Sequence, residues 1–217
     1  MASSSRKARL YGGMDAEERR AERRLRLIDA AIEVYGEVGY RVATVKAICE
    51  AAELTERYFY ESFANSEALL IAAYNHVVGH LHEEMMAAAA AAGGDPEARL
   101  RAALTLYFTR LKQHPKPARV FLLEISGISP AVDAVKLDAL RVFSDILVPP
   151  TSDPKRGDKA AMAMLLSNGM VGAVISIALR WVSKQYPQSV EDVVVIAASF
   201  CRVALTEANR HQDWHSR

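Results

Sequence analysis

Apolar side chains recur at helical spacing along almost the whole chain, and this periodicity restricts the possible folds more than any other feature. In the first clear example, Ile28, Ala31, Ile32, Tyr35 and Val38 fall at positions i, i+3, i+4, i+7 and i+10, which form one face of a helix. Nowhere do apolar and polar residues alternate for long enough to predict a strand. We therefore expect an all-α fold.

Glycines, prolines and capping residues divide this pattern into about nine helices. Gly39 is suited to end the first helix because glycine adopts a positive φ at low cost, and Thr44 and Thr55 are suited to begin the next two. Prolines mark later breaks, most clearly between residues 149 and 154. The expected helices span about residues 16–38, 45–52, 56–63, 66–92, 96–113, 118–126, 131–147, 156–184 and 189–209.

The composition is that of an ordinary folded protein and excludes several classes. The 217 residues are 51% hydrophobic and 24% charged, so a disordered chain is excluded and one or two domains are expected. A net charge of +1 does not indicate nucleic-acid binding, so such a prediction must rest on local residues. Two cysteines are too few for a disulfide framework or a four-ligand zinc site. The N-terminal segment has no apolar stretch typical of secretory signals, and we expect a cytoplasmic protein.

Charge is distributed unevenly between the first residues and those that follow. Residues 1–26 hold eight basic and four acidic side chains, whereas residues 27–64 hold three basic and seven acidic ones. Residues 1–19 are also rich in serine and glycine, and we interpret them as a flexible basic arm. Such an arm is suited to enter a minor groove, as homeodomain arms do, or it is a disordered segment that aids solubility.

Two short expected helices, 45–52 and 56–63, follow each other with about three residues between them, which is the spacing of a helix-turn-helix. The surrounding sequence, TVKAICEAAELTERYFYESFANSEALL, resembles the helix-turn-helix of TetR-type transcriptional regulators. The shared features are Gly39-Tyr40 ahead of the motif, Thr44 at its start, the pair Tyr60-x-x-Phe63, and Glu67-Ala68-Leu69 at the start of the next helix.

This resemblance implies both the organisation and the function of the chain. It implies a helix-turn-helix DNA-binding domain at residues 20–66, after the arm at residues 1–19, and an effector-binding and dimerisation domain at residues 67–217. It also implies a ligand-responsive repressor that binds a pseudo-palindromic operator on double-stranded DNA as a homodimer. The sequence departs from the family at Glu53, where a glycine is common just before the turn.

The start of the second helix carries the residues expected to read DNA. In a helix-turn-helix this helix enters the major groove, and its N-terminal residues reach the base edges. Here these residues are Thr55, Glu56, Arg57 and Tyr58. An arginine can bind guanine through two hydrogen bonds, and the two hydroxyl groups can contact phosphates or bases. Alternatively, Arg57 is a solvated helix charge and Tyr58 a packing aromatic.

Three further residues are predicted to contact the DNA backbone. Tyr60 lies where the TetR-type family usually contacts a phosphate, although it could instead be a surface or packing aromatic. Thr44 offers a hydroxyl group and the free amides of a helix start to another phosphate, and Lys46 lies near the same end.

Twenty consecutive residues, 160–179, carry no charge, which is long enough to cross a membrane. Against a membrane span, Ser167 and Asn168 place polar groups near the centre of this run. The last expected helix is also strongly apolar, and two such helices indicate a large protein interface. In the TetR-type family this pair forms a four-helix bundle with its twin. We therefore predict a homodimer through about residues 158–183 and 189–209, and no membrane partner.

The central helices, at about residues 97–147, carry large apolar side chains and few charges. Together with Met170 and Trp181 of the next helix and a few polar groups such as Glu124 and Asn168, they suit a cavity for a small, mostly apolar effector. The alternative for each residue is that it packs in the core. The candidate effector-binding residues are Tyr107, Phe108, Phe121, Glu124, Phe143, Asn168, Met170 and Trp181.

Signals for other chemistry are weak. His76 and His80 have a spacing that can bind zinc, but the sequence places no third ligand, and a half-buried helix face explains them. We find no nucleophile elbow, glycine-rich phosphate loop or paired-carboxylate pattern, so we expect no enzyme, cofactor or metal. Two alternatives stay open, a membrane-tethered DNA-binding sensor and a helical binding or enzyme module without DNA recognition.

Overall fold

The computed structural model describes the backbone of residues 4–147 and 157–214, with most side chains between residues 16 and 206. The described residues form helices and contain no strand, which confirms the all-α prediction. The elements are α1 (Ser4–Val38), α2 (Val45–Ala51), α3 (Glu56–Ser62), α4 (Ser66–Ala91), α5 (Pro96–Gln113), α6 (Pro115–Arg119), the π-helical turn η1 (Val120–Glu124), α7 (Pro130–Leu147), α8 (Gly157–Ser183) and α9 (Val190–Trp214).

Helix α1 begins at Ser4, whereas the sequence predicted a flexible arm over residues 1–19. No proline occurs between residues 4 and 38, and arginine, alanine and glutamate dominate this segment. These residues have high helix propensity, and it outweighs the weakening effect of Gly12 and Gly13. The expected start of the first helix near residue 16 was therefore wrong, whereas the role of residues 1–19 as a basic arm stays a prediction.

A second difference lies between α5 and α7. The chain returns to helix at Pro115 rather than near residue 118, because proline fits the first turn of a helix, where an N–H has no intrahelical acceptor. Residues Val120–Glu124 then form a π-helical turn, which the apolar pattern did not indicate. Such turns are rare and often lie at functional sites.

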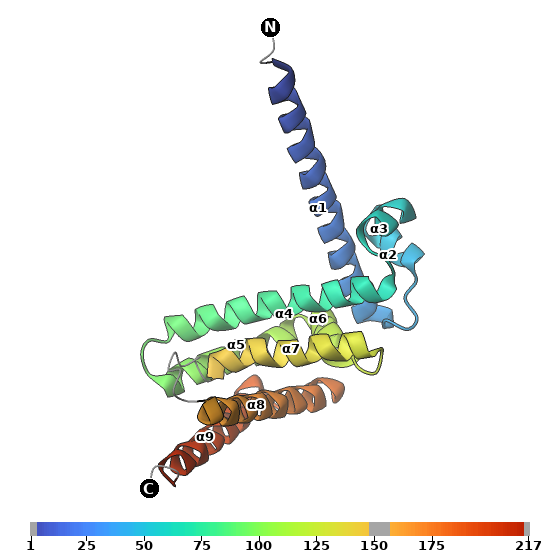
Figure 1. Cartoon of the computed structure of the whole chain (residues 1–217). Coiled ribbons are helices and arrows are strands. Elements are labelled where there is room, and N and C mark those ends of the chain that lie inside the picture. The colour runs from blue at the N-terminus through green and yellow to red at the C-terminus, as the bar shows by residue number, and fades with distance from the viewer. Residues whose placement is uncertain (1–3, 148–156, 215–217) are drawn as a thin grey trace.

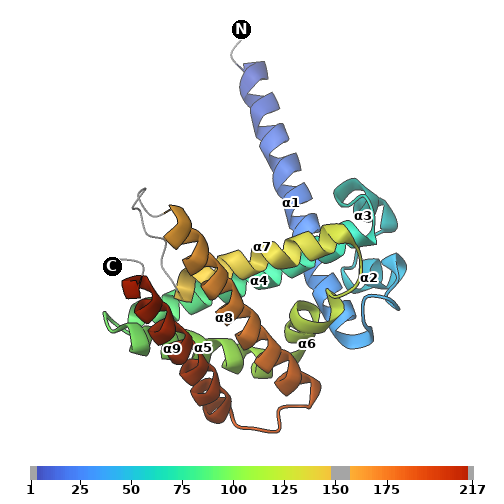
Figure 2. The same ribbon diagram turned by 60° about the horizontal axis from the view of Figure 1, so that its bottom comes forward.

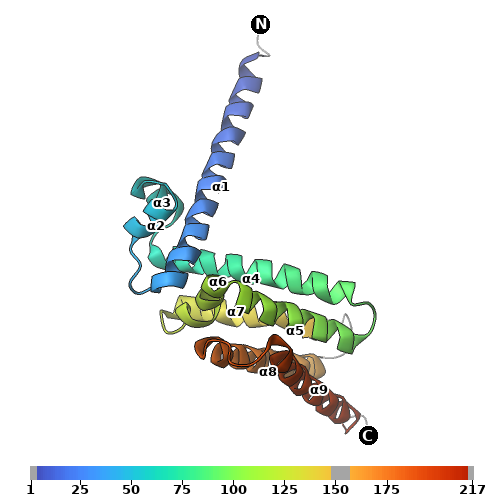
Figure 3. The same ribbon diagram turned by 180° about the vertical axis from the view of Figure 1, so that it is seen from behind.

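The helices pack in layers, with the first half of α1 projecting away from them (Figure 1). Helices α2 and α3 lie beside α1 and form with it the head of the molecule. Below the head, α4 packs on α5 and α7, and α8 packs on α7 and α9. Viewed from below, α8 and α9 lie side by side on the face opposite α4 (Figure 2). The rear view shows α1 ending where α4 and α6 meet (Figure 3).

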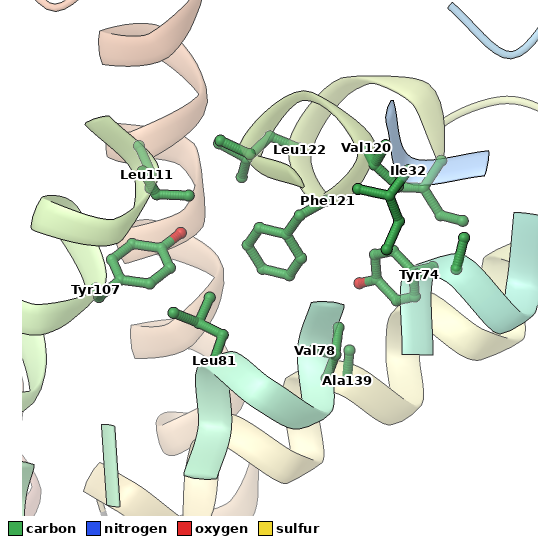
Figure 4. Packing of buried hydrophobic residues seen from close by; sticks show 14 of the residues in the cluster. Ile32, Tyr74, Val78, Leu81, Tyr107, Leu111, Val120, Phe121, Leu122 and Ala139 are labelled. Atoms are coloured by element: carbon green, nitrogen blue, oxygen red, sulfur yellow. The ribbon is translucent and has the colours of Figure 1, made fainter. Parts of the chain in front are cut away.

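An aromatic cluster fills the centre of the core. Phe121, on the π-helical turn, stacks on Tyr74 with ring centroids 5.8 Å apart. Its edges meet the rings of Tyr107 at 6.4 Å and Phe143 at 5.9 Å. Figure 4 shows Phe121 between Tyr107 and Tyr74, with Leu81 and Val78 of α4 nearby. Side chains from α4, α5, α7 and η1 therefore meet at this one ring.

The head joins the core at a close contact between α1 and α6. A Cβ atom added to Gly36 would lie 2.4 Å from Cβ and 2.6 Å from Cα of Lys116, so only glycine allows this approach. The Lys116 ammonium then bridges the carboxylates of Glu33 at 2.9 Å and Glu37 at 3.0 Å. The absence of one side chain thus sets the distance between the head and the core.

Replacing Gly36 with alanine tests this contact. The added methyl group meets backbone as well as side chain, so α6 must move, and we expect a loss of about 1–3 kcal/mol in the free energy of unfolding. Gly79→Ala is the matched control, because a Cβ there meets nothing within 4 Å. In denaturant unfolding the control should be neutral or slightly stabilised. Equal stability of the two variants would contradict the assigned role of Gly36.

Candidate nucleic-acid interface

The turn of the helix-turn-helix is built on an unusual backbone conformation at Glu53. This residue has a φ of +52°, in the left-handed region that favours glycine. The amide of Glu53 donates to Glu50 O at 3.1 Å, and that of Leu54 donates to Cys49 O at 2.9 Å. These two bonds form a Schellman motif that ends α2 and directs the chain into α3. Glu53, where the TetR-type family commonly has glycine, therefore occupies the position at which glycine would adopt the left-handed conformation with least strain.

One face of α3 is buried against the head, and this burial orients the opposite face of the helix towards solvent. Phe59 is fully buried and Phe63 nearly so, and they pack with Ile48 and Cys49 of α2, as the sequence predicted. Burial, followed by the nearby Glu56 carboxylate, raises the pKa of the Cys49 thiol. Because the aromatic residues point inward, the first turn of α3 points to solvent.

Arginines of α1 hold this motif in place. Arg20 donates to Glu61 O at 2.8 Å, Arg24 to Ser62 O at 2.7 Å, and Arg26 to Ala52 O at 2.5 Å. The Arg24 guanidinium also lies over the Phe63 ring, 4.1 Å from its centroid. The sequence identified these side chains only as part of a basic segment. In the structure they satisfy carbonyl groups at the ends of α2 and α3.

The four predicted base-reading residues lie at the start of α3 with different surroundings. Thr55, Glu56 and Arg57 are exposed, and Thr55 makes no capping hydrogen bond with the described part of the chain. Arg57 Nε donates to Glu61 Oε1 at 2.9 Å, so DNA would have to replace Glu61 as its partner. Tyr58 is half-buried, and the Arg23 guanidinium lies 4.6 Å from its ring centroid.

The three predicted phosphate contacts also reach solvent. Thr44 Oγ1 accepts a hydrogen bond from Ala47 N at 3.1 Å, so it caps α2 and keeps its own hydrogen to donate. Lys46 is exposed, with its ammonium 3.8 Å from the Glu50 carboxylate. Tyr60 is 63% exposed, and its ring meets Phe59 edge to face at 5.1 Å. Burial excludes none of the seven residues from DNA.

The predicted effector residues do not form one site. Tyr107, Phe121 and Phe143 line a common cavity of about 30 Å³ with apolar neighbours such as Met85, Leu104 and Val174. The Tyr107 hydroxyl is buried and has no hydrogen-bond partner among the described residues, and burial strongly raises its pKa. Phe108, Met170 and Trp181 are buried but do not line this cavity.

The two polar candidates lie elsewhere. Asn168 Oδ1 accepts from the Ser144 hydroxyl at 2.8 Å, which joins α8 to α7. Glu124 faces the head, where its carboxylate accepts from Tyr40 N at 2.8 Å and from Arg119 Nε at 2.7 Å. Glu124 therefore does not line the 30 Å³ cavity, and its part in effector binding stays a prediction. Tyr40 lies just after α1, 84 positions before Glu124. A pattern of neighbouring residues in the sequence therefore could not predict this contact.

An exposed apolar surface runs along α8 and α9. On α9, Val195, Ile196, Phe200 and Val203 recur at helical spacing and are 44–61% exposed. On α8, Met164, Leu165 and Leu179 are exposed as well. Among the described residues, one helix segment, Met164–Ser183, is long and apolar enough to cross a membrane by length and composition. Helix α8, which contains this segment, packs on α5, α7, α9 and η1.

Replacing Glu53 with glycine should stabilise the protein. A non-glycine residue in the left-handed region costs about 1–2 kcal/mol, part of which glycine loses again through its flexible unfolded state. We expect a net gain of up to about 1 kcal/mol, seen as a melting temperature roughly 2–4 °C higher. Glu50→Gly, inside α2, is the matched control and should destabilise. A lower melting temperature for Glu53→Gly would contradict the strained turn.

Comparisons with known proteins agree with this geometry. Residues 27–73 match the family model described as bacterial regulatory proteins, tetR family. The chain is 26% identical over 191 residues to the HTH-type transcriptional regulator BetI of Rhizobium meliloti (strain 1021), covering 84% of this chain and 89% of that protein.

Solved structures share the fold over most of the chain. The fatty acid degradation regulator FadR from Bacillus halodurans has a TM-score of 0.67 at 21% identity, covering 82% of this chain and 94% of its own. FadR from Bacillus subtilis, in complex with stearoyl-CoA, has a TM-score of 0.64 at 21% identity, covering 83% and 96%. Residues 27–73 therefore carry the DNA-binding domain of the TetR family of bacterial regulatory proteins, and solved regulators share the fold of most of the chain.

Proposed function

We propose that this regulator is a ligand-responsive repressor that binds a pseudo-palindromic operator as a homodimer in the cytoplasm. The observation that carries the proposal is the exposed first turn of α3, held by the arginines of α1 and backed by buried Phe59. In this proposal residues 20–66 are the DNA-binding domain and residues 67–217 bind the effector and the second subunit. Its role is binding rather than catalysis.

The DNA contacts divide into base-reading and backbone contacts. On binding DNA, the Arg57 guanidinium leaves the Glu61 carboxylate and donates to a guanine instead. Thr55 and Tyr58 contribute hydroxyl groups beside it. Glu56, on the same turn, repels phosphates and so favours a position over bases. Thr44, Lys46 and Tyr60 bind phosphates and set the register of the head on the duplex.

The apolar surface of α8 and α9 supports a homodimer. Exposed residues such as Phe200 and Val203 have no cover within the described chain, and a two-fold pairing of this surface removes them from water. Two heads related by that axis would meet half-sites roughly 34–36 Å apart. A membrane-tethered sensor is the rival, but α8 packs on α7 and α9, and its Asn168 accepts a hydrogen bond from Ser144 of α7.

A small apolar effector fits the cavity around Phe121 once that cavity opens. At about 30 Å³ it is closed to any organic ligand, so binding must displace the rings of Phe121 or Phe143. The unpartnered Tyr107 hydroxyl offers the effector one hydrogen bond. The complex of Bacillus subtilis FadR with stearoyl-CoA supports an acyl-type effector for this chain too.

Phe121 and Glu124 connect this cavity to the head. Both lie on η1, so a displaced Phe121 moves the turn that carries Glu124. Glu124 accepts from Tyr40 N, and its partner Arg119 donates to Glu37 O at 3.0 Å, both at the end of α1. An effector that binds the moved conformation more tightly than the DNA-compatible one empties the operator.

Arg57→Ala tests the DNA contact. Loss of one bidentate base contact should weaken binding by about 1–3 kcal/mol, or about 5- to 150-fold. Gel shifts with duplex DNA from the promoter beside its own gene measure the affinity. Arg141→Ala, an exposed arginine on α7, is the control and should bind like the parent. Unaltered binding by Arg57→Ala would rule out its proposed role.

Phe200→Glu tests the homodimer. A carboxylate in the middle of a buried apolar interface is strongly unfavourable, so the variant should be a monomer. Analytical ultracentrifugation measures the mass. Leu137→Glu, on the exposed face of α7 at 63% exposure, is the matched control and should remain a dimer. A parent that sediments as a monomer, or a Phe200→Glu variant that stays dimeric, would refute this interface.

A further inference from the structure

A second and larger hollow lies where the head meets the core. This junction groove, of about 540 Å³, is bounded by α1, α4, α5 and α6. Its floor is apolar and includes Ile32, Leu81, Leu111 and Phe121. Phe121 is the one lining residue that it shares with the 30 Å³ cavity, so both spaces border that side chain. The volume is within the range of small-molecule sites.

The rim of the groove carries more negative than positive charge. Three carboxylates line it, from Asp29 and Glu33 on α1 and Glu84 on α4, against one guanidinium, from Arg110 on α5. Arg110 holds Glu84 through two bonds, of 2.6 and 2.9 Å. Lys116 lies outside the lining and shares its charge between Glu33 and Glu37. The lining therefore has an excess of two negative charges.

Three histidines, His76, His80 and His114, complete the rim. His76, the partner of Asp29 at 3.6 Å, meets the ring of His80 with centroids 4.4 Å apart. Burial, followed by the proximity of His80, lowers the pKa of His76 and outweighs the opposing effect of Asp29. His114 contacts Arg110 at 3.3 Å. At neutral pH the charge of Asp29 is thus left without a matching cation from His76.

We propose that the junction groove is a binding site for a small apolar cation, such as a substituted ammonium or phosphonium ion. The cation would lie between the carboxylates of Asp29 and Glu84, and its apolar body would cover the floor, including Phe121. Charge complementarity favours a cation over an anion of the same shape. The apolar floor favours such an ion over a small, strongly hydrated one.

Occupancy of this groove would act on the head directly. A ligand there touches Asp29, Ile32 and Glu33 of α1 and also the faces of α4 and α5. The effector proposed for the small cavity reaches α1 only through η1. The groove is therefore a separate point of control, and its ligand does not need the small cavity to open.

Isothermal titration of the full chain with tetraphenylphosphonium tests this site. Tetraphenylborate has the same shape and the opposite charge, so it is the ligand control. We expect saturable binding of one phosphonium ion per chain, about tenfold or more tighter than that of the borate. No saturable phosphonium binding, or tighter binding of the borate, would overturn the proposal.

Two substitutions in one ion pair locate the ligand. Glu84→Gln removes a negative charge and should weaken phosphonium binding about tenfold, whereas Arg110→Gln frees Glu84 and should strengthen it. Both break the same pair, so structural damage alone would shift both affinities in the same direction. Glu83→Gln, an exposed neighbour outside the lining, should change nothing. Parallel shifts for the two variants, or none, would place the phosphonium ion elsewhere and refute the site.

Discussion

The packing of α6 against Gly36 is the contact on which the rest of the molecule depends. Helix α1 belongs to both parts of the protein, since its arginines hold α2 and α3 and its last turns meet α6. The close approach at Gly36 brings Lys116 to Glu33 and Glu37, and it brings Arg119 and Glu124 to the end of α1. The position of the DNA-binding surface is thus set by contacts with the core.

Within the head, the turn between α2 and α3 requires a backbone conformation that lowers the stability of the folded state. The left-handed turn at Glu53 costs free energy, and Arg26 offsets part of this cost by binding Ala52 O and lying 3.6 Å from the Glu53 carboxylate. Arg57 donates to Glu61 on the same helix. If Arg57 reads a base, as we propose, the base must compete with this carboxylate, and a base that offers poorer acceptors binds less well.

The sequence predicted those features that depend on local chemistry. Helical periodicity gave the fold class, and the capping pattern at Thr44 and the buried pair Phe59 and Phe63 gave the helix-turn-helix. The sequence did not predict the features that depend on contacts between residues far apart in the chain. Glu124 bonds to Tyr40, 84 positions away, and the cavity walls come from four separate helices and η1. The start of α1 was missed because glycine and serine were given more weight than the helix propensity of its arginines and alanines.

The central claim is that two heads, held at a fixed distance by the core, read one duplex together. Hydroxyl-radical footprinting of promoter DNA bound to the full chain measures this most directly. We expect two short protected segments on one face of the duplex, with centres about one helical turn apart and equal protection at both. A single protected segment per bound protein, or protection spread evenly along the duplex, would contradict the arrangement described for α1, α3 and the α8–α9 surface.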